Sequence, residues 1–344
     1  MTTYHTGLIR RPGAVAAPEG SLDRAVAWHH GDPLGEQRAA VRAAALFDRS
    51  NRPVLTIAGE DRLSWLHSIC SQHVEGLGDG QGARSLVLSP HGHVEQDWIV
   101  TELGGALWLD TEPDQAEEVL GYLQKMRFLK RVEPALVSDD WAVLTLIGPA
   151  GAQVAQAAGL PDPGSAPHTA VALPGGGFVR RMPDLVAGRL DLVVPRAQAE
   201  ALAERLLEAG AAAAGSWAFE ALRVEARDPR LRRETDHRTI PHEIDLIGVA
   251  VHLNKGCYRG QETVARVQNL GRPPRRMVQL YLSGDQDAPP EAGTAVELDG
   301  RAVGFLGTAV QHHQLGPIAL AVIKRTVPDD AVLRIAGAPA TIAR

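Results

Sequence analysis

The residues most suited to carrying out chemistry lie in the stretch "NKGCYRGQETVARV". In it, Cys257 follows Lys255 by two positions and closely precedes Arg259. The residues after Gly260 are typical of a short helix that begins just after that glycine and ends at Gly271. A thiol close to a helix N-terminus and to cationic side chains favours its thiolate form. The pattern therefore indicates an activated thiol or an anion-binding loop, or else a turn whose half-buried cysteine has no chemical role.

Cys257 and Cys70 are the two cysteines of the chain, and they form no CxxC pair. Structural zinc and iron–sulfur sites usually take four protein ligands, so we expect no metal site and no iron–sulfur cluster that this chain holds stably by itself. Cys70 ends the apolar helical stretch "RLSWLHSIC", which predicts a buried and inert thiol. A disulfide between the two is possible but is not favoured in a reducing compartment.

Length and composition place the chain among ordinary globular proteins. It has 344 residues, 44% of them hydrophobic and 22% charged, which favours two or three compact units. A formal net charge of −6 argues against general nucleic-acid binding. No apolar run is long enough to span a bilayer, and the first residues do not read as a secretory signal, so we expect a cytoplasmic protein without membrane contact.

Two successive α+β segments are predicted before the C-terminal part of the chain. Their strand–helix beginnings, "PVLTIAGEDRLSWLHSIC" and "WAVLTLIGPAGAQVAQAAGL", are similar to each other. Upstream, "EQRAAVRAAALF" at residues 36–47 has the spacing and the residue types of a helix. The pattern predicts two related layers, each an antiparallel sheet backed by helices, in residues 1–140 and 141–274.

The pattern changes after the linker "RPPRR". Residues 275–344 contain short alternating segments separated by Gly, Pro and Asp, which predicts a small antiparallel β-barrel or sandwich. The dipeptide Asp299-Gly300 between "TAVEL" and "RAVGFLG" indicates a two-residue hairpin turn.

Other polar clusters carry less specific signals. The histidines of "HGH" at residues 91–93, and likewise His312 and His313, read as exposed loop residues, because no further metal ligands accompany them. The mixed-charge stretch "RRETDHR" at residues 232–238 is predicted to be solvated.

The stretch "KGCYRGQE" resembles the signature of the YgfZ family, folate-binding proteins of iron–sulfur cluster maintenance that are related to the glycine cleavage T-protein. "LFDRSNRPVLTIAGEDRLSWLHSI" and "ALRVEARDPRLRRETDHRTIPHEIDL" are also similar to segments of that framework. The resemblance covers nearly the whole chain. It implies two ferredoxin-like α+β units and a C-terminal antiparallel β-barrel, arranged as a ring around a tetrahydrofolate pocket.

The resemblance also implies roles for individual residues. Glu225 matches the acid that contacts the folate pterin, and a carboxylate suits a pterin because it can accept adjacent N–H groups in pairs. Two positions depart from the T-protein: Gln96 replaces the first of two neighbouring aspartates, and Arg227 stands where relatives often have glycine. Both departures weaken an enzymatic role more than folate binding. The implied catalytic residues are Cys257 and Lys255, and the implied cofactor-binding residues are Glu225, Arg223, Asp97, Tyr258 and Gln261.

Three functions follow as hypotheses. The first is a tetrahydrofolate-binding accessory protein for iron–sulfur cluster assembly or repair, whose transient partners are iron–sulfur client or assembly proteins. The second is a folate-dependent aminomethyltransferase. The third is a folate-binding scaffold without thiol chemistry. The cysteine signature favours the first, because the T-protein lacks it.

Overall fold

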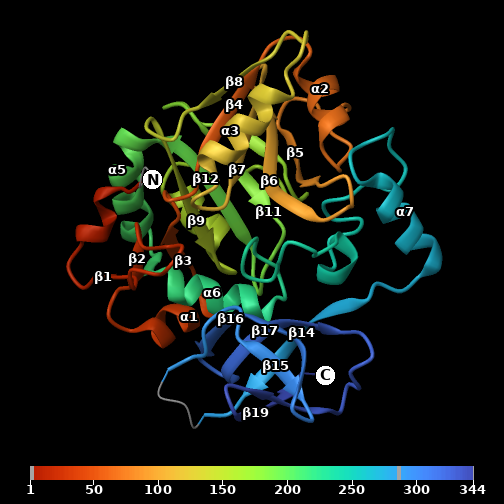
Figure 1. Cartoon of the computed structure of the whole chain (residues 1–344). Helices are drawn as coiled ribbons and strands as arrows, with labels where there is room; N and C mark the ends of the chain where they lie inside the picture. The colour runs from red at the N-terminus through yellow and green to blue at the C-terminus, as the bar shows by residue number, and fades with distance from the viewer. Residues whose placement is uncertain (1–3, 285–287, 344) are drawn as a thin grey trace. The chain divides into compact units, whose positions relative to one another are not determined.

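A computed structural model describes residues 4–284 and 288–343 (Figure 1). The chain divides into two compact units. The first comprises Met1–His67, Val74–Arg84 and Trp98–Phe219, and the second comprises Ser68–His73, Ser85–Asp97 and Glu220–Arg344. Two short segments from the first hundred residues therefore belong to the C-terminal unit.

The helices are short and separated by loops and strands. They are α1 (Pro33–Arg42), α2 (Arg62–Ile69), α3 (Ala116–Lys125), α4 (Gly151–Ala157), α5 (Arg196–Glu208), α6 (Ser216–Glu225) and α7 (Gln261–Leu270), with 3-10 turns η1 (Gly7–Arg10) and η2 (Pro241–Ile244). The predicted helix at residues 36–47 is wrong at its end. The helix stops at Arg42, and the buried strand β3 (Ala45–Asp48) pairs with β9, so tertiary pairing overrides the helix-forming composition.

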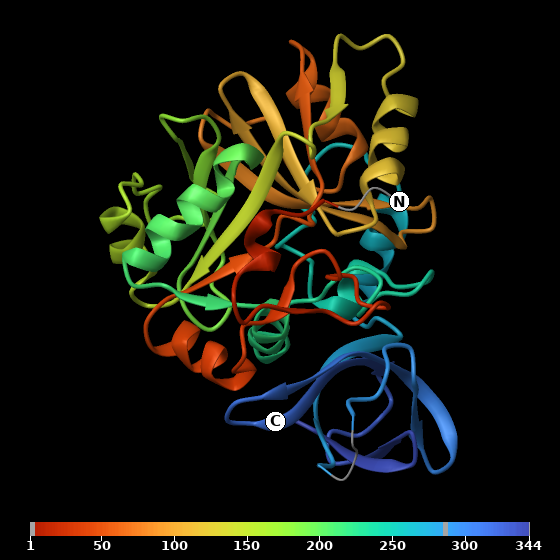
Figure 2. The same cartoon turned by 90° about the vertical axis from the view of Figure 1, so that its left-hand side faces the viewer.

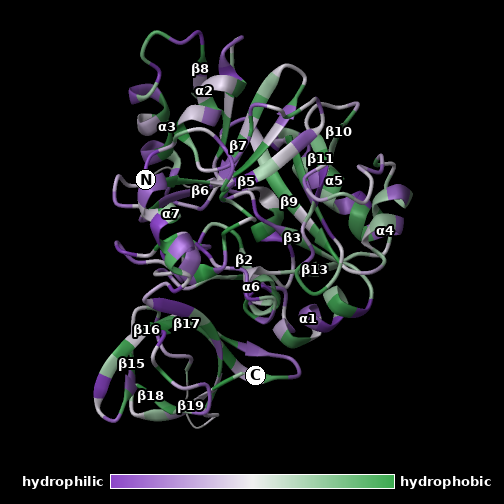
Figure 3. Ribbon diagram, turned by 90° about the vertical axis from the view of Figure 1, so that its right-hand side faces the viewer, coloured by the Kyte–Doolittle hydropathy of each residue, from purple (hydrophilic) through white to green (hydrophobic). Residues whose placement is uncertain are grey.

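A six-stranded sheet forms one layer of the first unit. Its order is β10 (Ala170–Ala172), β11 (Phe178–Met182), β12 (Arg189–Pro195), β9 (Trp141–Ile147), β3 and β13 (Ala212–Ala214). β13 runs parallel to β3, and the other pairs are antiparallel. β9 is buried along most of its length and is mostly hydrophobic (Figure 3), and residues of α4 and α5 share its core cluster.

The second large sheet has five strands, in the order β5 (Gln81–Leu88), β6 (Val94–Leu103), β7 (Ala106–Thr111), β4 (Val54–Ala58) and β8 (Glu133–Leu136). A two-stranded sheet of β1 (Val15–Ala16) and β2 (Ala27–His29) lies near the N-terminus. Each large sheet combines antiparallel strands with helices, as the alternating patterns predict.

Buried charges join the two large sheets within the first unit. Asp110 on β7 pairs with Arg180 on β11 at 2.5 Å, and the same guanidinium pairs with Asp191 on β12 at 3.2 Å. Burial raises the pKa of Asp191, but Arg189 and Arg180 lower it further, so it lies well below its usual value. Acids and arginines alternate along this chain of contacts: Glu112, Arg52, Asp110, Arg180, Asp191 and Arg189.

The C-terminal residues form a closed barrel, which Figure 2 shows nearly end-on. Its order is β14 (Arg275–Leu282), β17 (Gly316–Lys324), β16 (Arg301–His312), β15 (Ala295–Leu298), β18 (Val332–Ile335) and β19 (Ala338–Ile342), and every pair is antiparallel. Asp299 and Gly300 have φ angles of 51° and 72°, the left-handed pair of a type I′ turn, so the predicted hairpin is confirmed. The mixed α+β fold with a closed barrel confirms the predicted fold class.

Of the helices in the described part of the chain, none has the length and apolar character needed to cross a bilayer.

Candidate functional site

The helix predicted after the cysteine motif is α7, Gln261–Leu270. Gly260 and Gly271 flank it with φ angles of 83° and 74°, and the N–H of Gly271 donates to the carbonyl of Val267. Glycine adopts this left-handed conformation without the steric cost that a Cβ brings. The predicted helix bounds are confirmed, and Cys257 lies in the loop just before them.

Lys255 ties the motif loop to the rest of its unit. Its side chain is buried, and Nζ donates to the carbonyl of Cys70 at 2.6 Å and to that of Gln72 at 3.0 Å. The same nitrogen lies 5.3 Å from the ring centroid of Tyr258, and Gln261 Nε2 donates to the Lys255 carbonyl at 3.4 Å. The structure thus brings together three predicted residues, Lys255, Tyr258 and Gln261.

The segment that receives Lys255 is itself hydrogen-bonded to the residues before the motif. Ser71 Oγ donates to the Ala250 carbonyl at 2.7 Å, and Gln72 Nε2 donates to the Val249 carbonyl at 2.9 Å. The N–H of His252 donates to the Ser71 carbonyl at 3.0 Å. These bonds connect residues 71–72 to residues 249–252. The segment that accepts from Lys255 and the segment that leads into the motif are therefore held together, and we call this contact the Lys255 anchor.

The turn between β5 and β6 packs against the start of α7. A Cβ on Gly260 would lie 2.6 Å from the Ser89 carbonyl oxygen and 2.9 Å from Gly92 Cα. A Cβ on Gly92 would lie 2.8 Å from Thr263 Cβ. Both glycines are therefore needed for a close backbone approach. Gly256, by contrast, faces open space.

The two thiols differ as predicted in exposure. Cys257 is exposed, whereas Cys70 is buried with 1% of its surface accessible. Burial raises the pKa of the Cys70 thiol, although Lys255 lowers it in part. Arg259 pairs with Glu95 at 3.1 Å, so the cations that flank Cys257 in sequence both have carbonyl or carboxylate partners.

Glu225 is held by a histidine of the barrel. His312 Nδ1 accepts hydrogen bonds from the backbone N–H groups of Gln314 and Leu315, at 3.2 and 3.1 Å. In a neutral imidazole the proton must then be on Nε2, which lies 3.1 Å from Glu225 Oε2 and donates to it. Within the described residues, Glu225 Oε1 makes no hydrogen bond, and the side chain is 32% exposed.

The expected exposure of His312 is wrong. The residue is buried, with 1% accessible, because it ends β16 facing α6 and receives the backbone donors of the following turn. Sequence reasoning missed it, since a histidine pair without further ligands carries no signal for a carboxylate partner 87 positions away.

Arg223, two residues before Glu225 on α6, uses its whole guanidinium in contacts within the protein. Its guanidinium donates to both oxygens of Glu220, to Glu234 at 3.0 Å, and to Thr308 on β16. A further bond goes to the Asp228 carbonyl at 2.6 Å. These contacts use all five N–H donors of an arginine. In this conformation Arg223 has no further N–H group to offer a ligand.

The stretch "RRETDHR" is only partly solvated: Arg232, His237 and Arg238 are exposed, whereas its two acids pair with other side chains, which corrects that part of the prediction. Glu234 is fully buried and accepts from the Thr308 N–H as well as from Arg223. Asp236 receives both Nη atoms of Arg275, at 2.7 and 3.0 Å. The two acids of this stretch thus bond to residues of β14 and β16, because those strands pass beside them.

The remaining predicted residue is Asp97, on β6, with a half-buried side chain. Its neighbour Gln96 is buried, with 3% accessible, and its Oε1 has no hydrogen-bond partner among the described residues. A buried amide oxygen without a donor is unusual in a folded protein.

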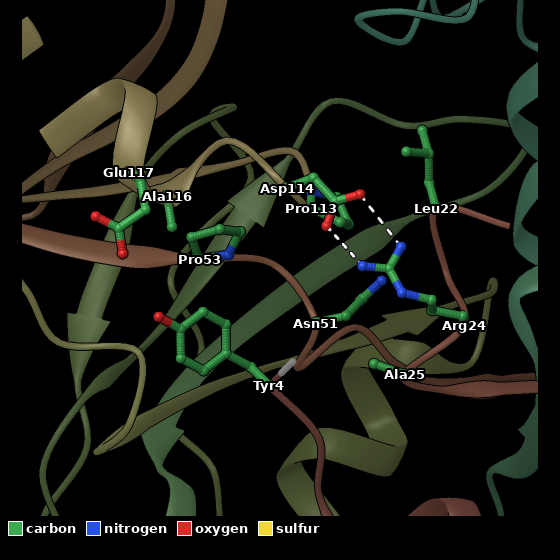
Figure 4. A pocket seen from close by; sticks show the side chains of 10 residues that line it. All are labelled: Tyr4, Leu22, Arg24, Ala25, Asn51, Pro53, Pro113, Asp114, Ala116 and Glu117. Carbon is green, nitrogen blue, oxygen red and sulfur yellow. Dashed lines mark hydrogen bonds and ion pairs between the residues drawn. The ribbon is translucent and has the colours of Figure 1, made fainter. Parts of the chain in front are cut away.

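A pocket in the first unit was not predicted (Figure 4). Its water-accessible volume is about 50 Å³, and it lies between Tyr4, Asn51, Pro53 and the turn at Pro113. Its most polar contact is internal, since Arg24 donates to both oxygens of Asp114 at 2.9 and 3.2 Å. No residue of the predicted site lines this pocket.

Comparisons with known proteins show which family the chain belongs to. A family model described as the GCVT N-terminal domain matches residues 6–163. An aminomethyltransferase of Geobacillus kaustophilus is 30% identical over 314 residues, which cover 86% of this chain and 83% of that protein. The chain belongs to the aminomethyltransferase family. A chloroplastic protein of Arabidopsis thaliana named as a transferase is 28% identical, and the match covers 76% of this chain but 60% of that protein, less than two thirds of its length.

The fold of this family member agrees with a solved structure. The crystal structure of glycine cleavage system aminomethyltransferase T from Bartonella henselae aligns with a TM-score of 0.87 at 20% identity, over 98% of this chain and 95% of that one. The predicted relation to the T-protein is confirmed, whereas the closer likeness to the YgfZ family stays a prediction. Among the described residues, no group of three or more His, Cys, Asp or Glu side chains could hold a metal ion.

Proposed function

We propose that this member of the aminomethyltransferase family is a tetrahydrofolate-binding accessory protein in iron–sulfur cluster assembly or repair, of the YgfZ type. The observation that supports it is the display of one thiol. Cys257 is exposed on a loop whose neighbours on both sides, Lys255 and Gly260, are fixed by buried contacts, while Cys70 is enclosed. Such a loop presents a nucleophile in a defined place.

A single thiolate suits a shared or transient site. It can attack an electrophile, exchange with a disulfide, or supply one ligand while a client protein supplies the others. The three remaining ligands of a typical cluster would have to come from a client or assembly protein. We therefore expect the partners to be iron–sulfur proteins or their assembly factors, and the protein to act in the cytoplasm.

The residues around Glu225 fit a folate. Glu225 Oε1 makes no hydrogen bond within the described residues, while His312 fixes the other oxygen, so the carboxylate is ready to accept pterin N–H groups. We expect Gln96, Asp97, Tyr258 and Gln261 to supply the further cofactor contacts that the family resemblance implies. A bound tetrahydrofolate would supply a one-carbon carrier.

An aminomethyltransferase is the second candidate, and the named relatives favour it. That reaction moves a one-carbon unit onto a folate nitrogen, where a pair of acids handles protons and charge better than one acid and an amide. Gln96 stands at the first of these positions and is a neutral side chain. Cys257 has no role in this alternative.

A deletion strain complemented with variants tests the proposal. We expect wild type and Cys70→Ala to restore the activities of iron–sulfur enzymes, and Cys257→Ala to fail at equal protein levels. Full complementation by Cys257→Ala would refute the thiol role. Robust tetrahydrofolate-dependent glycine cleavage by the purified protein would favour the transferase instead.

Titration with tetrahydrofolate tests the binding site separately. Losing an ionised acceptor from a desolvated site costs about 2–3 kcal/mol, so Glu225→Gln should bind roughly 30- to 150-fold more weakly. His312→Asn should weaken binding less, because it removes only the group that orients the carboxylate. Equal affinity for wild type and Glu225→Gln would remove Glu225 from the site.

A further inference from the structure

The turn that joins α3 to β8 in the first unit exposes two large apolar side chains. Phe128 is 78% exposed and Leu129 is 101% exposed, so the described part of the chain leaves both almost uncovered. In Figure 2 this turn lies past the end of α3, at the top of the view. Single exposed apolar residues are common in soluble proteins, whereas adjacent ones form a patch that suits contact with another surface.

The backbone holds these two side chains outward at a conformational cost. The N–H of Lys130 donates to the carbonyl of Arg127 at 3.0 Å, so Phe128 and Leu129 are the two central residues of the turn. Phe128 has a φ of 46°, in the left-handed region that favours glycine. A bulky residue is strained there, and the exposed ring gains little burial in return. The sequence thus places an aromatic side chain where the fold alone favours glycine.

Both ends of the turn are fixed to the rest of the unit. Trp65, which is 2% exposed, donates from Nε1 to the Met126 carbonyl at 2.7 Å. At the other end, the N–H of Arg131 donates to Asp61 Oδ2 at 2.8 Å, and the Arg131 guanidinium pairs with Glu60 and Asp61. The two apolar side chains therefore project from a well-anchored base.

Cations flank the apolar pair. The stretch "KMRFLKR" at residues 125–131 contains four cationic residues and no acid, in a chain whose formal net charge is −6. A hydrogen bond from Arg131 and the charge of Lys130 lower the pKa of Asp61, so these two cations are partly offset. Lys125 and Arg127 are exposed. Apolar side chains accompanied by exposed cations are typical of segments that enter the interface of an anionic membrane.

We propose that the turn at Phe128 and Leu129 inserts into the surface of an anionic lipid membrane. The two apolar side chains enter the headgroup region, and Lys125 and Arg127 lie among the lipid phosphates. Two side chains offer less than the roughly 800 Å² that each partner of a stable protein interface buries, whereas a bilayer needs no complementary shape. The expectation of no membrane contact rests on a search for a spanning segment, which a peripheral contact does not need.

Sedimentation of the full chain with sucrose-loaded vesicles tests this binding. The vesicles consist of phosphatidylcholine alone, or of phosphatidylcholine and phosphatidylglycerol in equal parts. We expect the anionic vesicles to bind the protein about tenfold more strongly or better, because each cation near the surface contributes about fivefold. Arg127→Gln should weaken that binding about fivefold, and Lys324→Gln, at an exposed position of β17, should change it little. Equal binding to the two compositions, or to neither, would overturn the proposal.

Phe128→Gly separates lipid binding from structure. The substitution removes the aromatic ring together with the left-handed strain, so binding to anionic vesicles should weaken about fivefold or more. The free energy of unfolding should not fall, because the ring is exposed. A variant that binds these vesicles as well as wild type, or that is less stable, contradicts the proposal.

A fluorophore at the turn shows which surface enters the lipid. Leu129→Cys is made in a Cys257→Ser background and labelled with an environment-sensitive nitrobenzoxadiazole group, which the buried Cys70 does not take up. We expect its emission to shift to the blue on anionic vesicles. The same label at Leu270→Cys, on an exposed position of α7, should not shift. A shift at residue 270 alone places the contact elsewhere, and no shift at residue 129 leaves the turn to a protein partner; either result rejects the proposal.

Discussion

Replacing Lys255 by methionine should loosen the anchor of the motif loop and expose Cys70. Methionine keeps the length and apolar character of the stem but leaves the carbonyls of Cys70 and Gln72 without their ammonium donor. Two hydrogen bonds to a charged group contribute about 1.5–3 kcal/mol each, and removing a buried ammonium returns part of this as recovered solvation. A net loss of roughly 2–3 kcal/mol remains for the closed state of the anchor.

Alkylation of Cys70 measures that loss directly. A buried thiol reacts only when its segment opens, so its rate follows the opening equilibrium when closing is fast. At a factor of ten per 1.36 kcal/mol, the predicted loss speeds labelling roughly 30- to 150-fold. The experiment uses a Cys257→Ser background, so that the exposed thiol does not consume reagent.

A lysine elsewhere in the unit provides the control. Lys324 is exposed on β17, and Lys324→Met should change the Cys70 rate less than about twofold. A Lys255→Met rate within a factor of three of the parent would refute the anchoring role. Lys255→Met can also be made in a Cys70→Ala background, where only Cys257 reacts. If Lys255 supports a Cys257 thiolate, alkylation of Cys257 should be slower in that variant.

Three further predictions concern the same unit. Gly260→Ala should lower the free energy of unfolding by about 2 kcal/mol or more in urea titrations, through its left-handed φ and its contact with the chain at Ser89, whereas Gly256→Ala should change it little. Burial raises the pKa of Asp236, but hydrogen bonds from Arg275 lower it well below its ordinary 3.8. The stability advantage of wild type over Asp236→Asn should therefore be full above pH 4 and shrink as the pH falls below it; a constant difference would contradict this. Burial also raises the pKa of Tyr258 from its ordinary 10.0 to about 12. Because the unfolded state loses this proton first, wild type should lose stability as the pH rises from 10 to 12. A Tyr258→Phe variant that loses as much stability over the same pH range would refute this.

Features set by local sequence could be predicted, and features set by distant partners could not. The bounds of α7 and the hairpin at Asp299 follow from the few residues that need left-handed φ angles, so the sequence alone indicates them. The burial of His312 depends on Glu225, and that of Glu234 depends on the barrel strand beside it. Such pairings are visible only once the elements pack together.

The strand β3 shows the same limit for secondary structure. Its residues continue a helix-forming run, yet they pair with β9 and β13 inside the six-stranded sheet. The gain from burying "ALF" between two strands exceeds the small helical preference of those residues. A prediction from composition alone therefore extends the helix too far.

The anchor formed by Lys255 has a consequence for the order of folding during synthesis. It joins positions 185 residues apart, so Cys70 and Gln72 leave the ribosome long before the motif loop exists. Contacts of such long range close late, because the chain between them must first be ordered. A ribosome-bound chain that ends before Lys255 leaves these carbonyls without the ammonium, so the motif loop takes its place only after residue 255 has been made. The anchored position of Cys257 therefore requires that residues 68–73 and the motif loop have both been made and have folded together.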